Sequence, residues 1–408
     1  MALRRLLFVV IVYLLLFSNA SAADIVVGTS AAFRGPSKGL GIELYRGAKA
    51  YFDYINQWGG VHGNNLVIKA YDDGYDPTPA IENTIKLIER DKVFLLMNYV
   101  GTPTVTRVLP LLKKYQNSDA FLFFPFTGAQ PQREFPYDAF VFNLRASYRQ
   151  ETEGLVDRFI AMGRSRIAVF YQADSYGRSG WDGVRRALHA HNLKIAAEAT
   201  YRRGAKFQDS MKQQTDIIKQ SSPDAVIAVG SYAACAAFIR DARDSGVTVP
   251  IANVSFVGSE NLLAQLQDAG KMNGKDYTAN LINSQVVPSY EDTSLAAVKQ
   301  YREIMDYYNP AAPGGLAEEG YKPLTYSFVS FEGFLNAKLL VEILNKMNTF
   351  DDKKLIRPTV EKINDLDIGI GTKVSFGPGR HQGLDVVYFT TVRDGKFVPI
   401  NNWEGWKK

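Results

Sequence analysis

Short apolar runs alternate with segments of helical spacing along most of the chain. The runs that predict buried strands are Ile25–Val27, Leu66–Ala70, Val93–Met97, Phe121–Phe124, Arg166–Tyr171, Ala225–Val229, Ile251–Val257 and Val386–Thr391. Between them, apolar side chains recur at helical spacing, as at Leu44, Ala48 and Phe52. Strands that alternate with helices predict βαβ units and mainly parallel sheets covered on both faces. The predicted fold class is therefore α/β.

Two of the apolar runs end abruptly in small residues that leave their backbone groups accessible. These residues are Gly101 and Thr102 after the first run, and Thr127, Gly128 and Ala129 after the second. Ligands of open parallel sheets bind outside the carboxyl ends of the strands, and helix starts attract anions. The two endings therefore predict two walls of one polar pocket. Ordinary strand-to-helix turns have the same composition, and that alternative stays open.

The first residues have the composition of a secretory signal peptide. Arg4 and Arg5 precede an apolar run from Leu6 to Phe17, and Ala20-Ser21-Ala22 fits the small-x-small cleavage pattern. We predict a cleaved signal peptide over residues 1–22 and a mature protein in the periplasm. The alternative is a retained signal anchor, although the apolar run is short for a transmembrane helix, which needs roughly 20 residues.

The sequence lacks the motifs of common catalytic and cofactor sites. Its four histidines have no metal-ligand spacing, and neither a Gly-x-Ser-x-Gly elbow nor a Walker loop occurs. The single cysteine, Cys235, cannot form an internal disulfide and is expected to pack on a helix. A net charge of +5 over 408 residues gives no signature of nucleic-acid binding. We expect a binding protein with no catalytic residues, no metal and no cofactor.

Five longer motifs follow one another along essentially the whole mature chain. They are FRGPSKGLG, GVHGNNLVIKAYDDGYDPTPAIENTIKLIERDKV, PFTGAQP, VFYQADSYGRSGWDGV and AVGSYAACAAFIRDAR. In this order and spacing the chain resembles the branched-chain amino acid binding proteins, which are periplasmic receptors of ABC transporters with a leucine-binding domain. The resemblance implies a type I periplasmic binding protein. In that fold, two doubly wound, Rossmann-like lobes are joined by three crossover strands and close on a ligand.

The same resemblance implies an organisation and a function. Lobe one is expected to take residues 24–144 plus 286–386, and lobe two residues 145–285 plus 387–408, with hinges near Leu144-Arg145, Gln285 and Val387. The protein is expected to be a monomeric, soluble receptor that delivers a small carboxylate-bearing solute to the membrane permease of an ABC importer. A sensor subunit that presents the solute to a membrane kinase or chemoreceptor is an alternative, and an exported enzyme is a remote one.

The resemblance also assigns site residues. The carboxylate of the ligand is expected at Gly101-Thr102 and at Thr127-Gly128-Ala129. Tyr176 is expected to reach across from lobe two, and Tyr232 to flank the amine of the ligand. The alternative for both tyrosines is a core aromatic side chain with its hydroxyl at the edge of the core.

One position departs from the pattern of the amino-acid binders. They carry an acidic residue on the strand after the helix of Tyr232, where it pairs with the ligand ammonium, and Ser255 aligns there. A buried ammonium without a counter-charge costs several kcal/mol. Either Asp174 or Glu260 supplies the charge, or the ligand is not an α-amino acid. The ligand is thus a branched-chain or other amino acid, or an amine-free carboxylate or amide.

Overall fold

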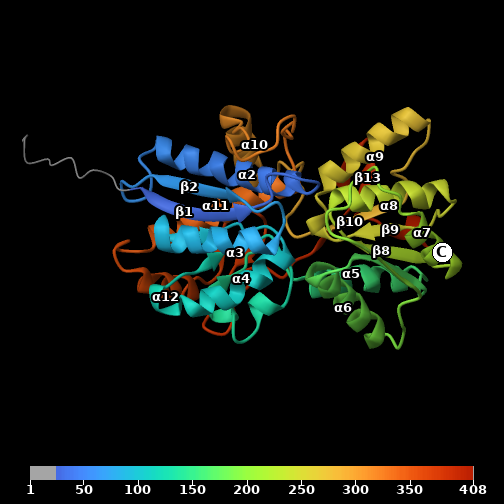
Figure 1. The fold of residues 1–408 in the computed structure, drawn as a ribbon, viewed down its shortest axis with the longest axis horizontal. Coiled ribbons are helices and arrows are strands. Elements are labelled where there is room, and N and C mark those ends of the chain that lie inside the picture. Colours follow the sequence, from blue (N-terminus) through green and yellow to red (C-terminus); the bar gives the residue numbers. More distant parts are fainter. Residues whose placement is uncertain (1–23, 408) are drawn as a thin grey trace, which may run out of the picture.

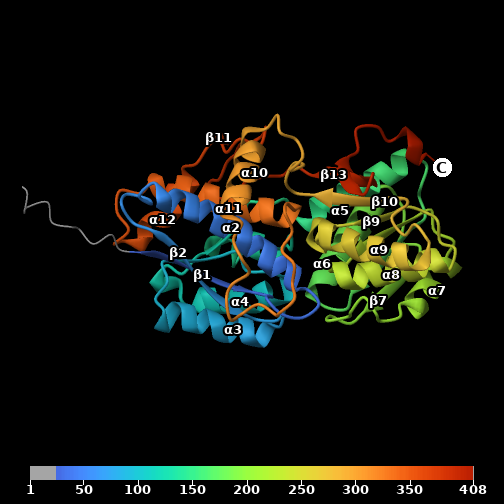
Figure 2. The same ribbon diagram turned by 90° about the horizontal axis from the view of Figure 1, so that it is seen from above.

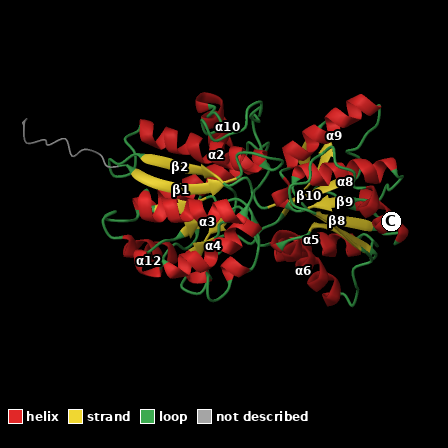
Figure 3. Cartoon of the chain, viewed as in Figure 1, coloured by secondary structure: helices red, strands yellow, loops and turns green. Residues whose placement is uncertain are grey.

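The computed structural model describes residues 24–407, so the predicted signal peptide lies outside the described residues. The chain forms two α/β bodies, on the left and right of Figure 1, and the C-terminus lies at the outer end of the right-hand body. In both bodies, helices cover the faces of a central sheet (Figure 3).

The left-hand body contains a five-stranded parallel sheet in the order β2-β1-β3-β4-β5. Its strands are β1 (Ile25–Ala31), β2 (Leu66–Asp72), β3 (Leu95–Met97), β4 (Leu122–Phe123) and β5 (Val141–Phe142). Its helices are α2 (Lys38–Gln57), α3 (Pro77–Ile85), α4 (Thr102–Lys114), α10 (Ala296–Tyr308), α11 (Phe328–Asn345) and α12 (Ile356–Glu361). A two-stranded ladder of β11 (Leu366–Asp367) and β12 (Lys373–Val374) follows them in the chain.

The right-hand body contains a seven-stranded sheet in the order β14-β13-β10-β9-β8-β6-β7. Its strands are β6 (Ile167–Gln172), β7 (Glu198–Tyr201), β8 (Ala225–Val229), β9 (Ile251–Asn253), β10 (Leu281–Gln285), β13 (Tyr388–Arg393) and β14 (Lys396–Pro399). Its helices are α5 (Tyr148–Ala161), α6 (Ser175–Ala190), α7 (Lys212–Gln220), α8 (Tyr232–Asp244) and α9 (Ser259–Asn273). The pairs β10–β13 and β13–β14 are antiparallel, and the other neighbouring strands of this sheet are parallel.

The burial of the strands explains why the apolar runs predict them. Every residue of β6 and of β8 is buried, as a parallel sheet covered on both faces requires. The structure confirms the predicted α/β fold with two doubly wound bodies. The predicted strand Ile251–Val257 is too long, because β9 ends at Asn253 and a 3-10 turn takes over at Ser255–Val257.

Three segments of the chain cross between the two bodies. They follow β5, β10 and β12, and the first and third lie side by side. The amide of Asn143 donates to the carbonyl of His381, and the amide of Gly383 donates back to the carbonyl of Asn143, both at 2.8 Å. Figure 2 shows the last crossover, in red, running toward β13. The residues that follow the strand ends of both sheets meet beside these crossovers.

Candidate functional site between the two bodies

The residues predicted after β3 and β4 come together at the start of α4. Thr102 is the first residue of α4, and its hydroxyl lies 2.6 Å from that of Thr127. Gly101 precedes the helix with a φ of 105°, and a Cβ there would lie 2.1 Å from the ring of Tyr75. Only glycine combines this backbone conformation with so close an approach. No side chain caps the first turn of α4, so its N–H groups add partial positive charge beside the two hydroxyls.

The expectation of accessible backbone groups at these strand ends is wrong. The amide of Gly101 donates to the carbonyl of Phe126 at 3.2 Å, and the amide of Ala129 donates to the hydroxyl of Thr127 at 3.3 Å. The carbonyl of Gly128 accepts from the amide of Tyr148 at 2.7 Å. Aromatic rings lie against these strand ends, Tyr75 of the same body at Gly101 and Tyr148 of the other body at Gly128.

Tyr148 is one of the covering side chains, and sequence reasoning missed it. It begins α5, which a capping box of Ser147 and Gln150 starts. A Cβ on Gly128 would lie 2.6 Å from the Tyr148 ring, so the glycine makes room for it. Burial raises the pKa of Tyr148, while the charge of Arg145 and then the nearby hydroxyls of Thr102 and Thr127 oppose that rise. The Tyr148 hydroxyl is buried and makes no hydrogen bond within residues 24–407.

Tyr176 lies next to Tyr148 in the first turn of α6. The two ring centroids are 5.3 Å apart, and the Tyr176 hydroxyl donates to the carbonyl of Gly230 at 3.3 Å. Asp174 caps this helix by accepting from the amide of Tyr176 at 2.9 Å. Burial raises the pKa of Tyr176 well above its usual value. Tyr176 therefore packs against Tyr148, and Tyr148 in turn lies near the threonine pair.

Tyr232 joins the two bodies at a different place. It begins α8, and its hydroxyl accepts from the amide of Gly39, in the first turn of α2, at 3.1 Å. Its ring lies close to Gly258, where a Cβ would be 3.5 Å from it. Burial raises the pKa of Tyr232 to about 12, so the phenol stays neutral in the physiological range. This hydrogen bond therefore joins the two bodies.

Ser255 lies in the 3-10 turn after β9, and Glu151 is its acidic neighbour. The backbone amide of Ser255 donates to Glu151 Oε2 at 2.8 Å, and its hydroxyl donates to Glu151 Oε1 at 3.0 Å. The hydroxyl of Ser284 also donates to Oε2, at 2.6 Å. Neither of the two acids considered from the sequence takes this place. Asp174 caps α6, and Glu260 accepts from the backbone amide of Phe328 at 3.3 Å.

Arg145 forms a buried charge cluster with Ser255, Glu151 and Glu332. The sequence suggested this arginine only as a hinge residue. Its Nη2 donates to the Ser255 hydroxyl at 2.5 Å, and its Nε lies 3.2 Å from Glu332 Oε1. The guanidinium lies 4.5 Å from the centroid of the Phe126 ring. Burial lowers the pKa of Arg145, but the carboxylates of Glu332 and Glu151 more than compensate, so the pKa ends above its usual value. Arg145 is therefore charged.

Two neighbours of this cluster have strongly shifted pKa values. Burial raises the pKa of Glu332 to about 7, although Arg145 opposes the rise. Burial, and then the charge of Arg145, lower the pKa of Arg133 to about 9. Arg133 donates to the carbonyls of Ala129 and Arg145 at 2.7 and 3.0 Å. The site therefore holds two arginines and two carboxyl groups close to the threonine pair.

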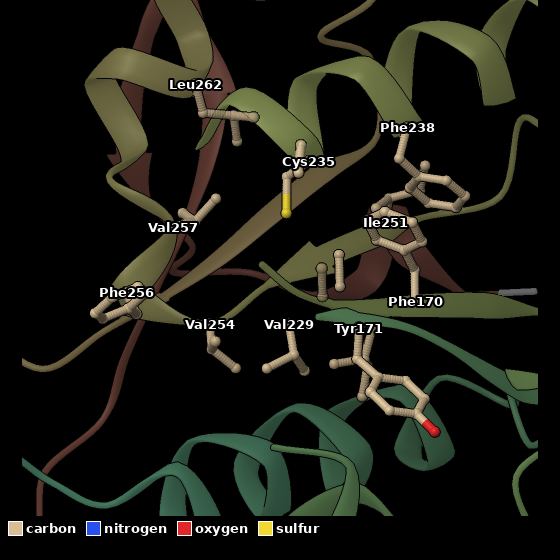
Figure 4. Packing of buried hydrophobic residues seen from close by; sticks show 14 of the residues in the cluster. Phe170, Tyr171, Val229, Cys235, Phe238, Ile251, Val254, Phe256, Val257 and Leu262 are labelled. Carbon is tan, nitrogen blue, oxygen red and sulfur yellow. The ribbon is translucent and has the colours of Figure 1, made fainter. Parts of the chain in front are cut away.

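The ring of Phe256 fills the space between the strand ends. Its centroid lies 4.5 Å from that of Tyr176, 5.3 Å from that of Phe126 and 5.9 Å from that of Tyr75. Figure 4 shows Phe256 at one side of the apolar core of the right-hand body, with Phe170 and Phe238 at the other. Aromatic side chains of both bodies thus pack together between the strand ends.

A groove of about 360 Å³ opens beside this packed region. Its lining residues include Gly128, Tyr148, Arg149, Arg178 and Asp182. Ligand pockets of proteins commonly span about 300–1,000 Å³, so the groove has room for a small solute. Because Gly128 and Tyr148 both line the groove, it extends to the residues that follow β4.

Two features of other kinds of site are absent from residues 24–407. No group of three His, Cys, Asp or Glu side chains lies together as metal ligands do. Nor does any helix in this part of the chain have the length and apolar character of a membrane span.

The sequence profile described as periplasmic binding protein matches residues 24–396. The chain belongs to this family. An amino acid binding protein of Pseudomonas aeruginosa is 23% identical over 324 residues, which are 78% of this chain and 79% of the relative. A Leu/Ile/Val-binding protein homolog of Brucella abortus is 23% identical over 326 residues, which are 78% and 84% of the two chains.

Solved structures support the assignment of this periplasmic binding protein. A "possible leucine/isoleucine/valine-binding protein" of Rhodopirellula baltica superposes with a TM-score of 0.83 at 30% identity, covering 96% of this chain and 100% of that one. A branched-chain amino acid ABC transporter protein of Thermus thermophilus with bound valine has a TM-score of 0.78 at 16% identity, covering 93% and 96% of the two chains. At that identity the second likeness concerns the fold alone. Family membership implies a periplasmic location.

Proposed function

We propose that the protein is a soluble periplasmic receptor that binds a small carboxylate-bearing solute between its two bodies and delivers it to an ABC importer. One observation carries the proposal. The hydroxyls of Thr102 and Thr127 lie 2.6 Å apart at the uncapped start of α4, and Tyr148 of the other body packs against Gly128, with which it lines a groove of about 360 Å³. Hydroxyls and helix-terminal N–H groups are suitable donors for a carboxylate.

The remaining predicted residues have complementary roles in this proposal. Gly101 and Gly128 allow the close approach of aromatic rings, and Ala129 keeps the Thr127 hydroxyl oriented through its amide. Tyr176 supports Tyr148, and Tyr232 holds the closed form through Gly39. Ser255 acts indirectly by holding the charge cluster in place.

In this proposal, the importer distinguishes the closed form of the protein from the open form. We take lobe one as residues 24–144 plus 286–386 and lobe two as residues 145–285 plus 387–408, with hinges in the crossovers. The hydrogen bonds that join these lobes include those of Gly39 with Tyr232, Gln172 with Tyr75 and Phe328 with Glu260, at 3.1, 3.3 and 3.3 Å. A solute that binds the closed form more tightly than the open form shifts the population toward closure. The membrane permease then recognises the closed monomer.

A thermal-shift screen of small carboxylates and amino acids tests the proposal. A solute present at 100 times its Kd adds roughly 2.7 kcal/mol of stability, which a melting curve detects easily. Recovery of the solute unchanged after incubation distinguishes a receptor from an enzyme. If no carboxylate raises the melting temperature, or if the best ligand binds Thr102→Val and the parent equally well, the proposed function is contradicted.

A further inference from the structure

Two arginines of the right-hand body each reach a carboxylate of the left-hand body. Nη1 of Arg149, in the first turn of α5, lies 3.1 Å from Oε1 of Glu134. Nη2 of Arg203, which follows β7, lies 3.4 Å from Oδ2 of Asp76, the N-cap residue of α3. Glu134 follows the 3-10 turn Pro131–Arg133, between β4 and β5, so both carboxylates belong to the left-hand body. Each ion pair therefore has one member in each body.

Helix α6 of the right-hand body holds both arginines in position. Oδ2 of Asp182 lies 3.4 Å from Nη2 of Arg149. Oδ2 of Asp174, the N-cap residue of α6, lies 3.7 Å from Nη1 of Arg203. Each guanidinium thus contacts an acid of its own body and an acid of the other body through different nitrogen atoms. If the bodies separated, each arginine would keep its partner on α6 and lose only the carboxylate of the left-hand body.

The first ion pair lies at the groove of about 360 Å³ that both bodies line. Glu134 and Arg149 are both among its lining residues, and Gln130, a third one, donates from Nε2 to Oε1 of Glu134 at 3.1 Å. The side chains of Arg149 and Arg203 are 34% and 29% exposed, so dissolved ions can screen both pairs. Exposed ion pairs contribute little to folding, but the open and closed forms of a hinged protein differ by a small free energy. A small contribution therefore changes their populations.

We propose that Arg149 and Arg203 are positioning residues that favour the closed form of the receptor through Glu134 and Asp76, so that closure weakens as the salt concentration rises. This inference rests on the proposed function, because it takes the arrangement with these ion pairs intact as the closed form. Opening separates the two members of each pair, and salt reduces the attraction that opposes this separation. Loss of one pair should lower the ratio of closed to open molecules about two- to fivefold, the usual strength of an exposed ion pair.

Small-angle scattering of the mature protein without any solute tests the inference. The two conditions are about 0.01 M and about 1 M NaCl, where the Debye length is about 30 Å and about 3 Å. The radius of gyration of the parent should be larger at the higher salt concentration, because the open population increases. The double variant Glu134→Gln, Asp76→Asn should have the larger radius at both concentrations, and asparagine remains a good N-cap for α3. A parent radius that does not respond to salt, or a double variant that matches the parent at low salt, would overturn the inference.

Arg185→Gln is the matched control, because Arg185 pairs with Asp182 within α6 at 2.8 Å. It should match the parent at both salt concentrations, and an opening as large as that of the double variant would contradict the role of the two bridging arginines. Glu134→Gln should have no further effect on the radius in an Arg149→Gln background, since its partner is already absent. Because the scattering needs no solute, its failure leaves the receptor function standing. Salt-dependent opening of a protein that binds no carboxylate would overturn the receptor function alone.

Discussion

The side-chain hydroxyls of Thr102 and Thr127 lie 2.6 Å apart, although 25 positions separate the two residues. Replacing Thr127 by valine should weaken binding of the carboxylate solute about tenfold or more, because a hydrogen bond to a charged group contributes roughly 1.5–3 kcal/mol. The free energy of unfolding should fall by only about 1 kcal/mol, the usual contribution of one neutral hydrogen bond. Calorimetric titration and urea unfolding measure the two effects.

Thr106 provides the matched control for this substitution. Its hydroxyl donates to the carbonyl of Thr102 one turn earlier in α4, at 2.7 Å, and does not reach Thr127. Thr106→Val should therefore bind the solute as tightly as the parent. Equal losses of affinity in the two variants would show that α4 responds to any such change and that the Thr127 hydroxyl is not a ligand contact.

The sequence predicts this hydroxyl pair because strand ends of a parallel sheet meet at one edge. Thr102 and Thr127 follow neighbouring strands, so pattern and topology together place them side by side. The charge cluster could not be predicted in this way. Arg145 and Glu151 contact Ser255 across 110 and 104 positions, between segments whose local patterns give no sign of each other. Only the packed structure brings these segments together.

The end of β9 is a second feature that the sequence pattern does not predict correctly. The run Ile251–Val257 is apolar nearly throughout and predicts one strand, but Ser255–Val257 forms a 3-10 turn. All three turn residues are buried, as strand residues would be, so apolar character cannot distinguish the two conformations. The difference matters for function, because the turn brings the Phe256 ring against Phe126 and Tyr176.

Tyr232→Phe tests whether the bond to Gly39 stabilises the closed form. The variant loses the acceptor for the Gly39 amide at the start of α2 and should shift the population toward the open form. Loss of one hydrogen bond of about 1 kcal/mol corresponds to roughly a fivefold weaker apparent affinity. Small-angle scattering without ligand should show a larger radius of gyration than that of the parent.

Tyr277→Phe is the corresponding control. Its hydroxyl bonds to Asn273 and Asp244 within the right-hand body, at 3.0 and 3.1 Å, and does not join the two bodies. This variant should match the parent in radius of gyration and affinity. If it opens the protein as much as Tyr232→Phe does, the bond to Gly39 has no special role in closure.

Glu260 should make the stability of the protein depend on pH. Burial raises its pKa from 4.5 to about 7 in the folded protein, so between these values the folded state binds more protons than the unfolded state. The free energy of unfolding should therefore be highest below about pH 4.5 for this group and decrease as pH rises through about 7. Glu260→Gln should remove that part of the dependence and be more stable than the parent at pH 8, by on the order of 1 kcal/mol or more.

Urea unfolding at several pH values between 4.5 and 8 measures this difference. Glu332 and Asp73 have similarly raised pKa values, so Glu260→Gln should flatten the curve of the parent without abolishing its slope. Glu153→Gln, at an exposed position of α5, should leave the slope unchanged. A slope in Glu260→Gln as steep as that of the parent would show that this carboxyl is not the cause.

Gly47 lies where α2 and α11 pack closest, and its replacement by alanine should destabilise the protein. A Cβ there would lie 1.8 Å from the backbone carbonyl oxygen of Ser330, and Gly333 of α11 has the reciprocal contact, 2.1 Å from the carbonyl of Leu44. Neither backbone can move without separating the helices. In an exposed helix, Gly→Ala gains roughly 0.5–1 kcal/mol, but overpacking here should reverse the sign and cost about 1–3 kcal/mol or more. Gly314→Ala, with open space around its Cβ, should change the free energy of unfolding by less than about 0.5 kcal/mol. A Gly47→Ala protein as stable as the parent in urea would show that the two helices can separate at little cost.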